Sequence, residues 1–154
     1  MDAHRPNRHR GCYFLFVDNL RPDQQQALFD LAVQLAGADG TFSAEEKRYL
    51  NAYMAHFGIE ADFSRAEQRS LEELAEAFDT PESRVIALQQ LIRLGYKDGH
   101  FSEEERERVL ALAQKLGLND PEFILRVERW VRTLFDWFWE GEQMIEEAAQ
   151  AKRC

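Results

Sequence analysis

Apolar and polar residues alternate at helical spacing in two stretches of this chain that copy each other. Residues 35–58 read LAGADGTFSAEEKRYLNAYMAHFG, and residues 94–117 read LGYKDGHFSEEERERVLALAQKLG. At an offset of 59 residues, each stretch has the same Asp-Gly pair, Phe-Ser pair, glutamate and closing glycine. A fixed period with matching turn residues indicates one supersecondary unit used twice.

The first unit, about residues 20–79, predicts three helices. Pro22 suits the first turn of a helix, because its missing N–H would be unpaired there anyway. That helix ends near Gly37, and its core face is formed by residues at i, i+3, i+4 and i+7: Leu28, Leu31, Ala32 and Leu35. Ser43 and Glu46 form a capping box that opens a second helix, which stops at Gly58. The predicted core face of this second helix consists of Leu50, Tyr53, Met54 and Phe57. A third helix is expected over about residues 64–78.

The second unit, about residues 80–139, repeats this order. A fourth helix is expected over about residues 81–96, and Ser102 with Glu105 opens a fifth. The predicted core face of the fifth helix consists of Val109, Leu112, Ala113 and Leu116. A sixth helix follows Asp120-Pro121 and matches the third at the same offset. After Gly141 we expect a separate terminal helix over about residues 142–152.

The two units are predicted to form one all-α domain, because no stretch shows convincing β-strand alternation. This domain covers residues 12–154, and the basic stretch 1–11 is predicted to be a disordered tail. Residues 12–20 are aromatic-rich, and we expect a short helix or an extended arm laid on the bundle. One mismatch matters: Gln90 falls where Leu31 stands in the first unit, so the two halves cannot bury identical faces.

Composition agrees with a single globular domain of 154 residues, with 45% hydrophobic and 31% charged residues. The formal net charge of −9 weighs against nucleic acid as a partner, because polyanion binding needs an excess of lysine and arginine. The two cysteines, Cys12 and Cys154, form no disulfide framework and no metal-binding spacing, so a cytoplasmic protein is expected. No segment has the roughly 18 apolar residues of a transmembrane helix.

The two Asp-Gly loops are candidate cation sites. The run from Asp39 to Glu46 matches the second part of a calcium-binding EF-hand loop, and the run from Asp98 to Glu105 does the same. The first and third ligand positions of both loops, however, fall on residues without a side-chain oxygen: Leu35, Gly37, Leu94 and Tyr96. One loop therefore cannot supply the six to eight oxygens of a calcium site.

If the two units pack about a pseudo-twofold axis, the loops could pool Asp39, Glu46, Asp98 and Glu105 around one divalent cation. The alternative needs no metal: each glycine stops one helix, and each serine and glutamate start the next. Ca²⁺, Mg²⁺, Mn²⁺ and Zn²⁺ are all candidates for such a site.

Aromatic residues crowd the end of the sixth predicted helix. One stripe, predicted to be core, consists of Val127, Trp130, Val131, Leu134 and Phe138. Trp137 and Trp139 point elsewhere, and Phe135 flanks the stripe. Either a helix returning after Gly141 covers them, or they form an exposed apolar patch for a protein partner, a second copy or a membrane surface. Phe135, Trp137 and Trp139 are thus the candidate partner surface.

Signatures of catalysis are absent from the sequence. It has no Gly-x-Ser-x-Gly elbow, no phosphate-binding Gly-Lys loop and no recognisable Cys–His nucleophile pair. It also lacks the Glu-x-x-His motif of carboxylate-bridged di-iron bundles. We therefore expect a protein that is not an enzyme.

The doubled motif Asp-Gly-x-Phe-Ser-x-x-Glu-x-x-x-(Leu or Val) resembles the TerB (tellurite-resistance) family, whose domain also occurs at the start of some membrane-anchored DnaJ-like co-chaperones. The resemblance covers roughly residues 20–139. It implies a compact helical bundle of pseudo-repeats and a bacterial cytoplasmic protein tied to metal or chemical stress. It also implies an acidic surface for a divalent cation, carried here by Asp39, Glu46, Asp98 and Glu105. No His-Pro-Asp occurs, so co-chaperone activity does not carry over.

These observations lead to two functional hypotheses. The first is a non-enzymatic, stress-associated binding module with a divalent cation at its Asp-Gly loops. The second is a scaffold for protein–protein interaction or self-association, which uses the aromatic end of the sixth helix and needs no metal. A peripheral contact with a membrane is compatible with the second hypothesis.

Overall fold

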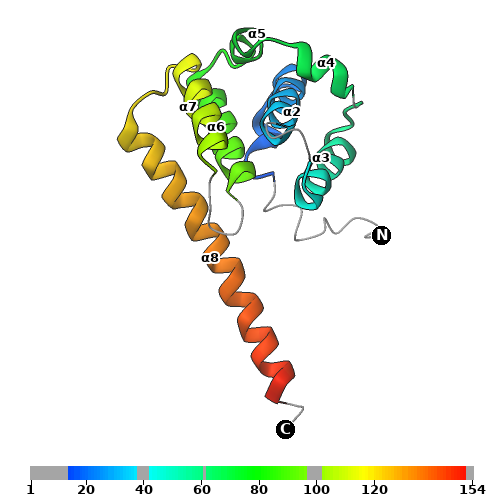
Figure 1. Ribbon diagram of the computed structural model, residues 1–154, viewed down its shortest axis with the longest axis vertical. Helices are drawn as coiled ribbons and strands as arrows, with labels where there is room; N and C mark the ends of the chain where they lie inside the picture. The colour runs from blue at the N-terminus through cyan, green and yellow to red at the C-terminus, as the bar shows by residue number, and fades with distance from the viewer. Residues whose placement is uncertain (1–13, 38–41, 61, 97–101, 152–154) are drawn as a thin grey trace.

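The computed structural model describes residues 14–37, 42–60, 62–96 and 102–151 of the chain. Within these residues there is no strand, which confirms the all-α prediction. The elements are η1 (Val17–Asn19), α2 (Pro22–Ala36), α3 (Ala44–Phe57), α4 (Phe63–Gln68), α5 (Leu71–Glu76), α6 (Pro81–Gly95), α7 (Glu103–Lys115) and α8 (Pro121–Ala151). Helices α2 to α7 gather in a bundle, and α8 leaves it and extends far beyond the other helices (Figure 1). The predicted basic tail, residues 1–11, lies outside the described residues.

The sequence repeat is visible in the local structure of both units. Helices α2 and α6 each begin with a proline, and each is 15 residues long. At the start of α3, the Ser43 hydroxyl accepts a hydrogen bond from the backbone N–H of Glu46, three positions further on, at 3.1 Å, and Ser102 accepts one from Glu105 in the same way at the start of α7. Gly58 and Gly117 end these helices with left-handed φ angles of 65° and 74°. The predicted caps and stops are therefore present at the predicted offset.

Helices α2 and α6 pack against each other at the centre of the bundle. In the first unit, α3, α4 and α5 pack against α2, and in the second unit α7 and α8 pack against α6. The predicted core faces of α2 and α7 are buried throughout, from Leu28 to Leu35 and from Val109 to Leu116. Each unit is thus built around its own first helix, and the two first helices form the junction.

The third helix of the first unit differs from the prediction. The expected single helix over about residues 64–78 is broken into α4 and α5 at Arg69 and Ser70. The Gln34 side chain donates hydrogen bonds to the carbonyls of Ala66 and Arg69, at 2.8 Å each, and so satisfies backbone groups that the break leaves open. The Arg69 guanidinium also pairs with the buried Asp30 at 2.6 Å. Contacts from α2 therefore stabilise a break between α4 and α5 that could not be predicted from the local sequence.

The terminal helix also differs from the prediction. Instead of one helix ending near residue 139 and another over about residues 142–152, α8 runs without a break from Pro121 to Ala151. Gly141 lies inside it. A glycine costs a helix roughly 1 kcal/mol relative to alanine but does not by itself end one. Up to Ala151, the last residue that the structure describes, the chain therefore does not turn back to cover the aromatic run.

The N-terminal segment explains the mismatch at Gln90. The Phe14 ring is buried against the rings of Tyr49 and Tyr53, with centroids 5.5 Å apart, so this segment lies on α3 as an arm. Gln90 is buried, and its Nε2 donates to the carbonyl of Leu15 at 2.8 Å. Its Oε1 accepts from the Tyr49 hydroxyl at 3.5 Å. Where the first unit buries a leucine, the second unit uses a glutamine that fastens the arm.

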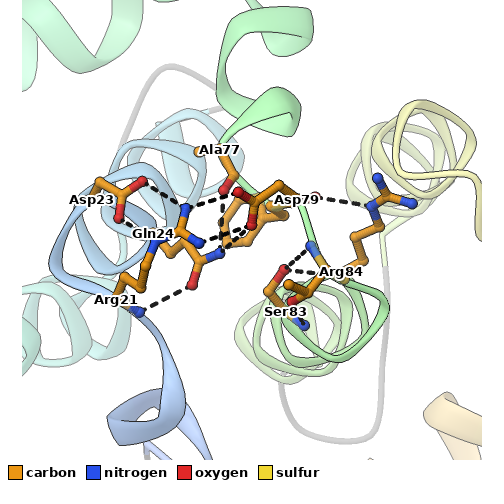
Figure 2. Close-up of polar contacts among 9 residues, drawn as sticks. Arg21, Asp23, Gln24, Ala77, Asp79, Ser83 and Arg84 are labelled. Atoms are coloured by element: carbon orange, nitrogen blue, oxygen red, sulfur yellow. Dashed lines mark hydrogen bonds and ion pairs between the residues drawn. The ribbon is translucent and has the colours of Figure 1, made fainter.

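A polar network joins the beginnings of α2 and α6 (Figure 2). The Arg21 guanidinium contacts both Asp23 and Asp79, and its nearest oxygen on Asp79 is 2.9 Å away. The side-chain hydrogen bond from Arg21 lowers the pKa of Asp79 below its ordinary value of 3.8. The buried Gln24 donates to the Ala77 carbonyl and to Asp79, at 3.3 Å each. This network ties the beginning of α2 to the residues directly before α6, at the end of the first unit.

Candidate interaction surface along the terminal helix

The first half of α8 is held in the bundle by apolar packing. Ile124, Val127 and Val131 are buried where α8 packs on α6, and Val131 has no exposed surface at all. Trp130 is half-buried against the same core, and the exposed Phe16 of the N-terminal arm stacks on it, with ring centroids 6.3 Å apart. Of the predicted core stripe of this helix, Val127 and Val131 are therefore buried, and Trp130, Leu134 and Phe138 are half-buried.

The second half of α8 continues the same stripe beyond the other helices that the structure describes. At about 100° per residue, positions 134, 138, 141, 145 and 148 fall on the face that carries Val127 and Val131. Trp137 and Met144 lie beside this face, and Figure 1 shows that the bundle does not reach this part of α8. Trp137, Met144 and Ile145 are 66%, 67% and 72% exposed. We call Trp137, Phe138, Gly141, Met144, Ile145 and Ala148 the α8 stripe.

The other two aromatic candidates lie outside this stripe. Phe135 packs on Tyr96 of the bundle, with ring centroids 5.6 Å apart, and the Arg93 guanidinium lies 6.0 Å from its ring centroid. The neighbouring Arg132 donates to the Tyr96 hydroxyl at 2.8 Å, and this hydrogen bond raises the pKa of the guanidinium. Trp139 is 61% exposed but projects from a different side of α8 than Trp137, two positions away. Phe135 thus fastens α8 to the bundle, and of the three aromatic candidates Trp137 alone belongs to the α8 stripe.

Acidic residues border the α8 stripe. Residues 133–151 contain five carboxylates and no lysine or arginine, a net charge of −5 for this segment (five acidic minus zero basic residues). In helical projection, Glu140 and Glu147 lie along one edge of the stripe, and Glu142 and Glu146 lie along the other. The surface is therefore an apolar strip between two acidic edges.

Of the four candidate cation ligands, Glu46 and Glu105 lie within the described residues, each at the start of a helix. Glu46 is buried, and its carboxylate accepts a hydrogen bond from the backbone N–H of Ser43 at 3.0 Å, as the capping box requires. Glu105 occupies the equivalent position in α7, where its backbone N–H donates to Ser102. Asp39 and Asp98 lie outside the described residues. Among the residues that the structure describes, no three His, Cys, Asp or Glu side chains are grouped to hold a metal ion.

A half-open cavity of about 170 Å³ lies between α2, α5, α6 and α7. Its lining is mainly leucine, valine and alanine, and the polar side chains in it are those of Gln34 and Arg108. Arg108 donates to the Gln34 backbone carbonyl at 3.0 Å, which ties α7 to α2 beside the cavity. The lining contains no nucleophile, carboxylate or imidazole that could carry out acid–base or covalent catalysis.

The fold and this surface define a class of protein: an all-helical bundle of two pseudo-repeats that carries a projecting amphipathic helix. Comparisons with protein-family models, curated proteins and solved structures found no match. In the described part of the chain, no helix is both long and apolar enough to cross a membrane.

Sequence reasoning found Trp137 but missed the exposed Met144 and Ile145. The signal was present: apolar residues recur at positions 134, 138, 141, 145 and 148, which continues the stripe of the preceding helix. Reading Gly141 as a helix stop concealed it. Treating this glycine as a tolerated interior residue would have joined the two segments into one stripe.

Proposed function

We propose that this protein is a non-enzymatic protein–protein interaction module that binds its partner through the second half of α8. The observation that supports this proposal is one amphipathic stripe that is buried in the bundle at Val127 and Val131, half-buried at Leu134 and Phe138, and exposed at Trp137, Met144 and Ile145. A single exposed apolar side chain is ordinary, but Trp137, Met144 and Ile145 follow one another on one side of the helix. They span about 12 Å along the axis, at 1.5 Å per residue.

The way α8 is anchored favours binding. The Arg106 guanidinium pairs with Glu128 of α8 at 3.2 Å, and Phe135 and Arg132 both contact Tyr96. The exposed half is therefore the continuation of a helix whose direction the bundle fixes. A preorganised helix loses less conformational entropy on binding than a segment that must fold first.

The test is a selection of binding peptides from a random display library against the whole protein. We expect the selected peptides to lose binding to the double variant Trp137→Ala/Ile145→Ala. They should keep binding to Leu125→Ala, which removes a 52% exposed leucine from the other side of the same helix. Peptides whose binding is the same for wild type and the double variant would refute the proposal.

We propose a second candidate function, a divalent-cation site formed by the two Asp-Gly hinges. It is supported by the doubling of the Ser-capped helix start at Ser43 and Ser102, with Glu46 and Glu105 at equivalent positions. The resemblance to the TerB family supports a role in metal or chemical stress in a bacterial cytoplasm.

Calorimetric titration with Ca²⁺, Mg²⁺, Mn²⁺ and Zn²⁺ tests this second candidate. We expect saturable heat with wild type for one of the cations and its loss in the double variant Asp39→Asn/Asp98→Asn. Negligible heat with all four cations would remove the metal proposal and leave the interaction module unaffected.

A further inference from the structure

We propose that the partner of the α8 stripe is a basic amphipathic helix of another protein. This inference rests on the proposed function, since it assumes that α8 is the docking surface. An exposed apolar helix face can be covered by another protein, a second copy of this chain or a membrane surface, and we choose the first. The charge and the shape of the stripe decide between them.

Charge complementarity is the first argument. A helix that lies along the stripe brings the residues beside its own apolar face against Glu140 and Glu147 on one edge and Glu142 and Glu146 on the other. Lysine or arginine at those positions would be attracted, and further carboxylates would be repelled. A second copy would bring the four glutamates at the edges of its own stripe against these four, and residues 133–151 contain no positive side chain that could pair with them. A negatively charged membrane surface would be repelled by the same residues.

The second argument is the glycine in the middle of the stripe. A Cβ at Gly141 would meet no atom within 4 Å, and its φ is not in the left-handed region, so nothing in the described part of the chain requires a glycine there. A glycine in a helix interior costs helix stability. Its missing side chain leaves a notch in the stripe, between Trp137 and Phe138 on one side and Met144 and Ile145 on the other. This notch lets a partner backbone approach closely. Met144, flexible and polarisable, adapts to the shape of the partner.

The experiment uses two synthetic helical peptides of about three heptads with the same leucine stripe. One peptide carries lysine beside the stripe, and the other carries glutamate. Fluorescence anisotropy of each labelled peptide is measured against the whole protein at low and high salt, and sedimentation reports the mass of the protein alone. Circular dichroism of every variant controls for folding.

We expect the lysine peptide to bind at least about ten-fold more tightly than the glutamate peptide, and to weaken as salt rises. Changing Glu140, Glu142, Glu146 and Glu147 to glutamine should weaken binding of the lysine peptide about ten-fold. Each exposed charge pair contributes only modestly, so the effect is the sum over four positions. The matched control changes four exposed glutamates of the bundle to glutamine, and should change affinity less than about two-fold. These four are Glu67, Glu76, Glu104 and Glu107. Gly141→Ala should weaken binding while it increases helicity.

The outcomes separate this inference from the proposed function. Equal binding of both peptides, lost in Trp137→Ala, would overturn the basic partner but keep α8 as a docking surface. Self-association that Trp137→Ala abolishes, or binding to vesicles of anionic lipid, would likewise replace the partner and keep the surface. An equal loss of affinity in both glutamine variants would overturn the inference, because attraction to the net charge of the whole protein would explain it. Binding of the lysine peptide that Trp137→Ala leaves unchanged would overturn both.

Discussion

Gly141 offers a sharp test of the projecting helix, because substitution there should strengthen the helix that carries the surface. Gly141 has a helical backbone conformation within α8, and an added Cβ would meet no atom within 4 Å. Gly141→Ala therefore introduces neither backbone strain nor a clash. The expected gain is the full difference in helix propensity between glycine and alanine, about 0.9 kcal/mol.

This gain should appear locally rather than in the unfolding of the bundle. Residues beyond Gly141 make few contacts with the bundle, since Met144 and Ile145 are 67% and 72% exposed. Their amides exchange with solvent through local opening of α8. A gain of about 0.9 kcal/mol corresponds to about five-fold slower exchange of the amides in residues 142–151. Amide hydrogen exchange measured by mass spectrometry or NMR gives this factor directly.

A glycine in a different backbone conformation provides the control. Gly117 ends α7 with a φ of 74°, where an alanine side chain is strained, so Gly117→Ala should destabilise the protein by about 1–2 kcal/mol. Chemical denaturation measures this loss. Unchanged or faster exchange after Gly141→Ala would refute the continuous helix through this position and favour the break that the sequence suggested.

Three further predictions concern the bundle. Val131→Ala should lower the free energy of unfolding by about 2 kcal/mol, because Val131 is fully buried and its truncation leaves a cavity. Trp137→Ala should change the free energy of unfolding by no more than about 0.5 kcal/mol, because Trp137 is 66% exposed. Gln90→Leu should cost about 1–3 kcal/mol, because it leaves a carbonyl of the N-terminal arm without its donor. The stability advantage of wild type over Asp79→Asn should be constant at neutral pH and should disappear as the pH falls below about 4. The sign follows from the lowered pKa of Asp79: the stabilising carboxylate is ionised above its ordinary pKa of 3.8, and its contribution is lost as pH drops through the folded pKa.

Denaturant unfolding of each variant, repeated across pH for Asp79→Asn, measures these effects. Equal costs for Val131→Ala and Trp137→Ala would contradict the division of α8 into a packed and a free half. A neutral or stabilising Gln90→Leu would show that the arm is not fastened through this side chain. A difference between wild type and Asp79→Asn that grows toward acid would contradict the ion pair with Arg21.

Much of the local structure could be predicted because its causes lie within a few residues. A serine cap and the N–H that it accepts from are three positions apart, as at Ser43, and a glycine stop such as Gly58 needs only its own backbone freedom. The offset of 59 residues then transfers each of these assignments from one unit to the other. The candidate surface was found in part, because Trp137 departs visibly from the helical stripe of its neighbours.

The remaining features depend on residues that are distant in sequence. The break between α4 and α5 is stabilised by Gln34 and Asp30, which lie more than 30 positions before it. Gln90 is satisfied by the Leu15 carbonyl, 75 positions away. Whether a stripe is covered or free is also a tertiary property, since the same apolar spacing runs through both halves of α8. The sequence alone thus determined the repeat, the helices and their caps, because these follow from short-range hydrogen bonding and periodicity. Only the tertiary structure decided where a helix breaks, which polar groups are satisfied in the core and which half of α8 remains exposed, because those depend on what other parts of the chain bring into contact.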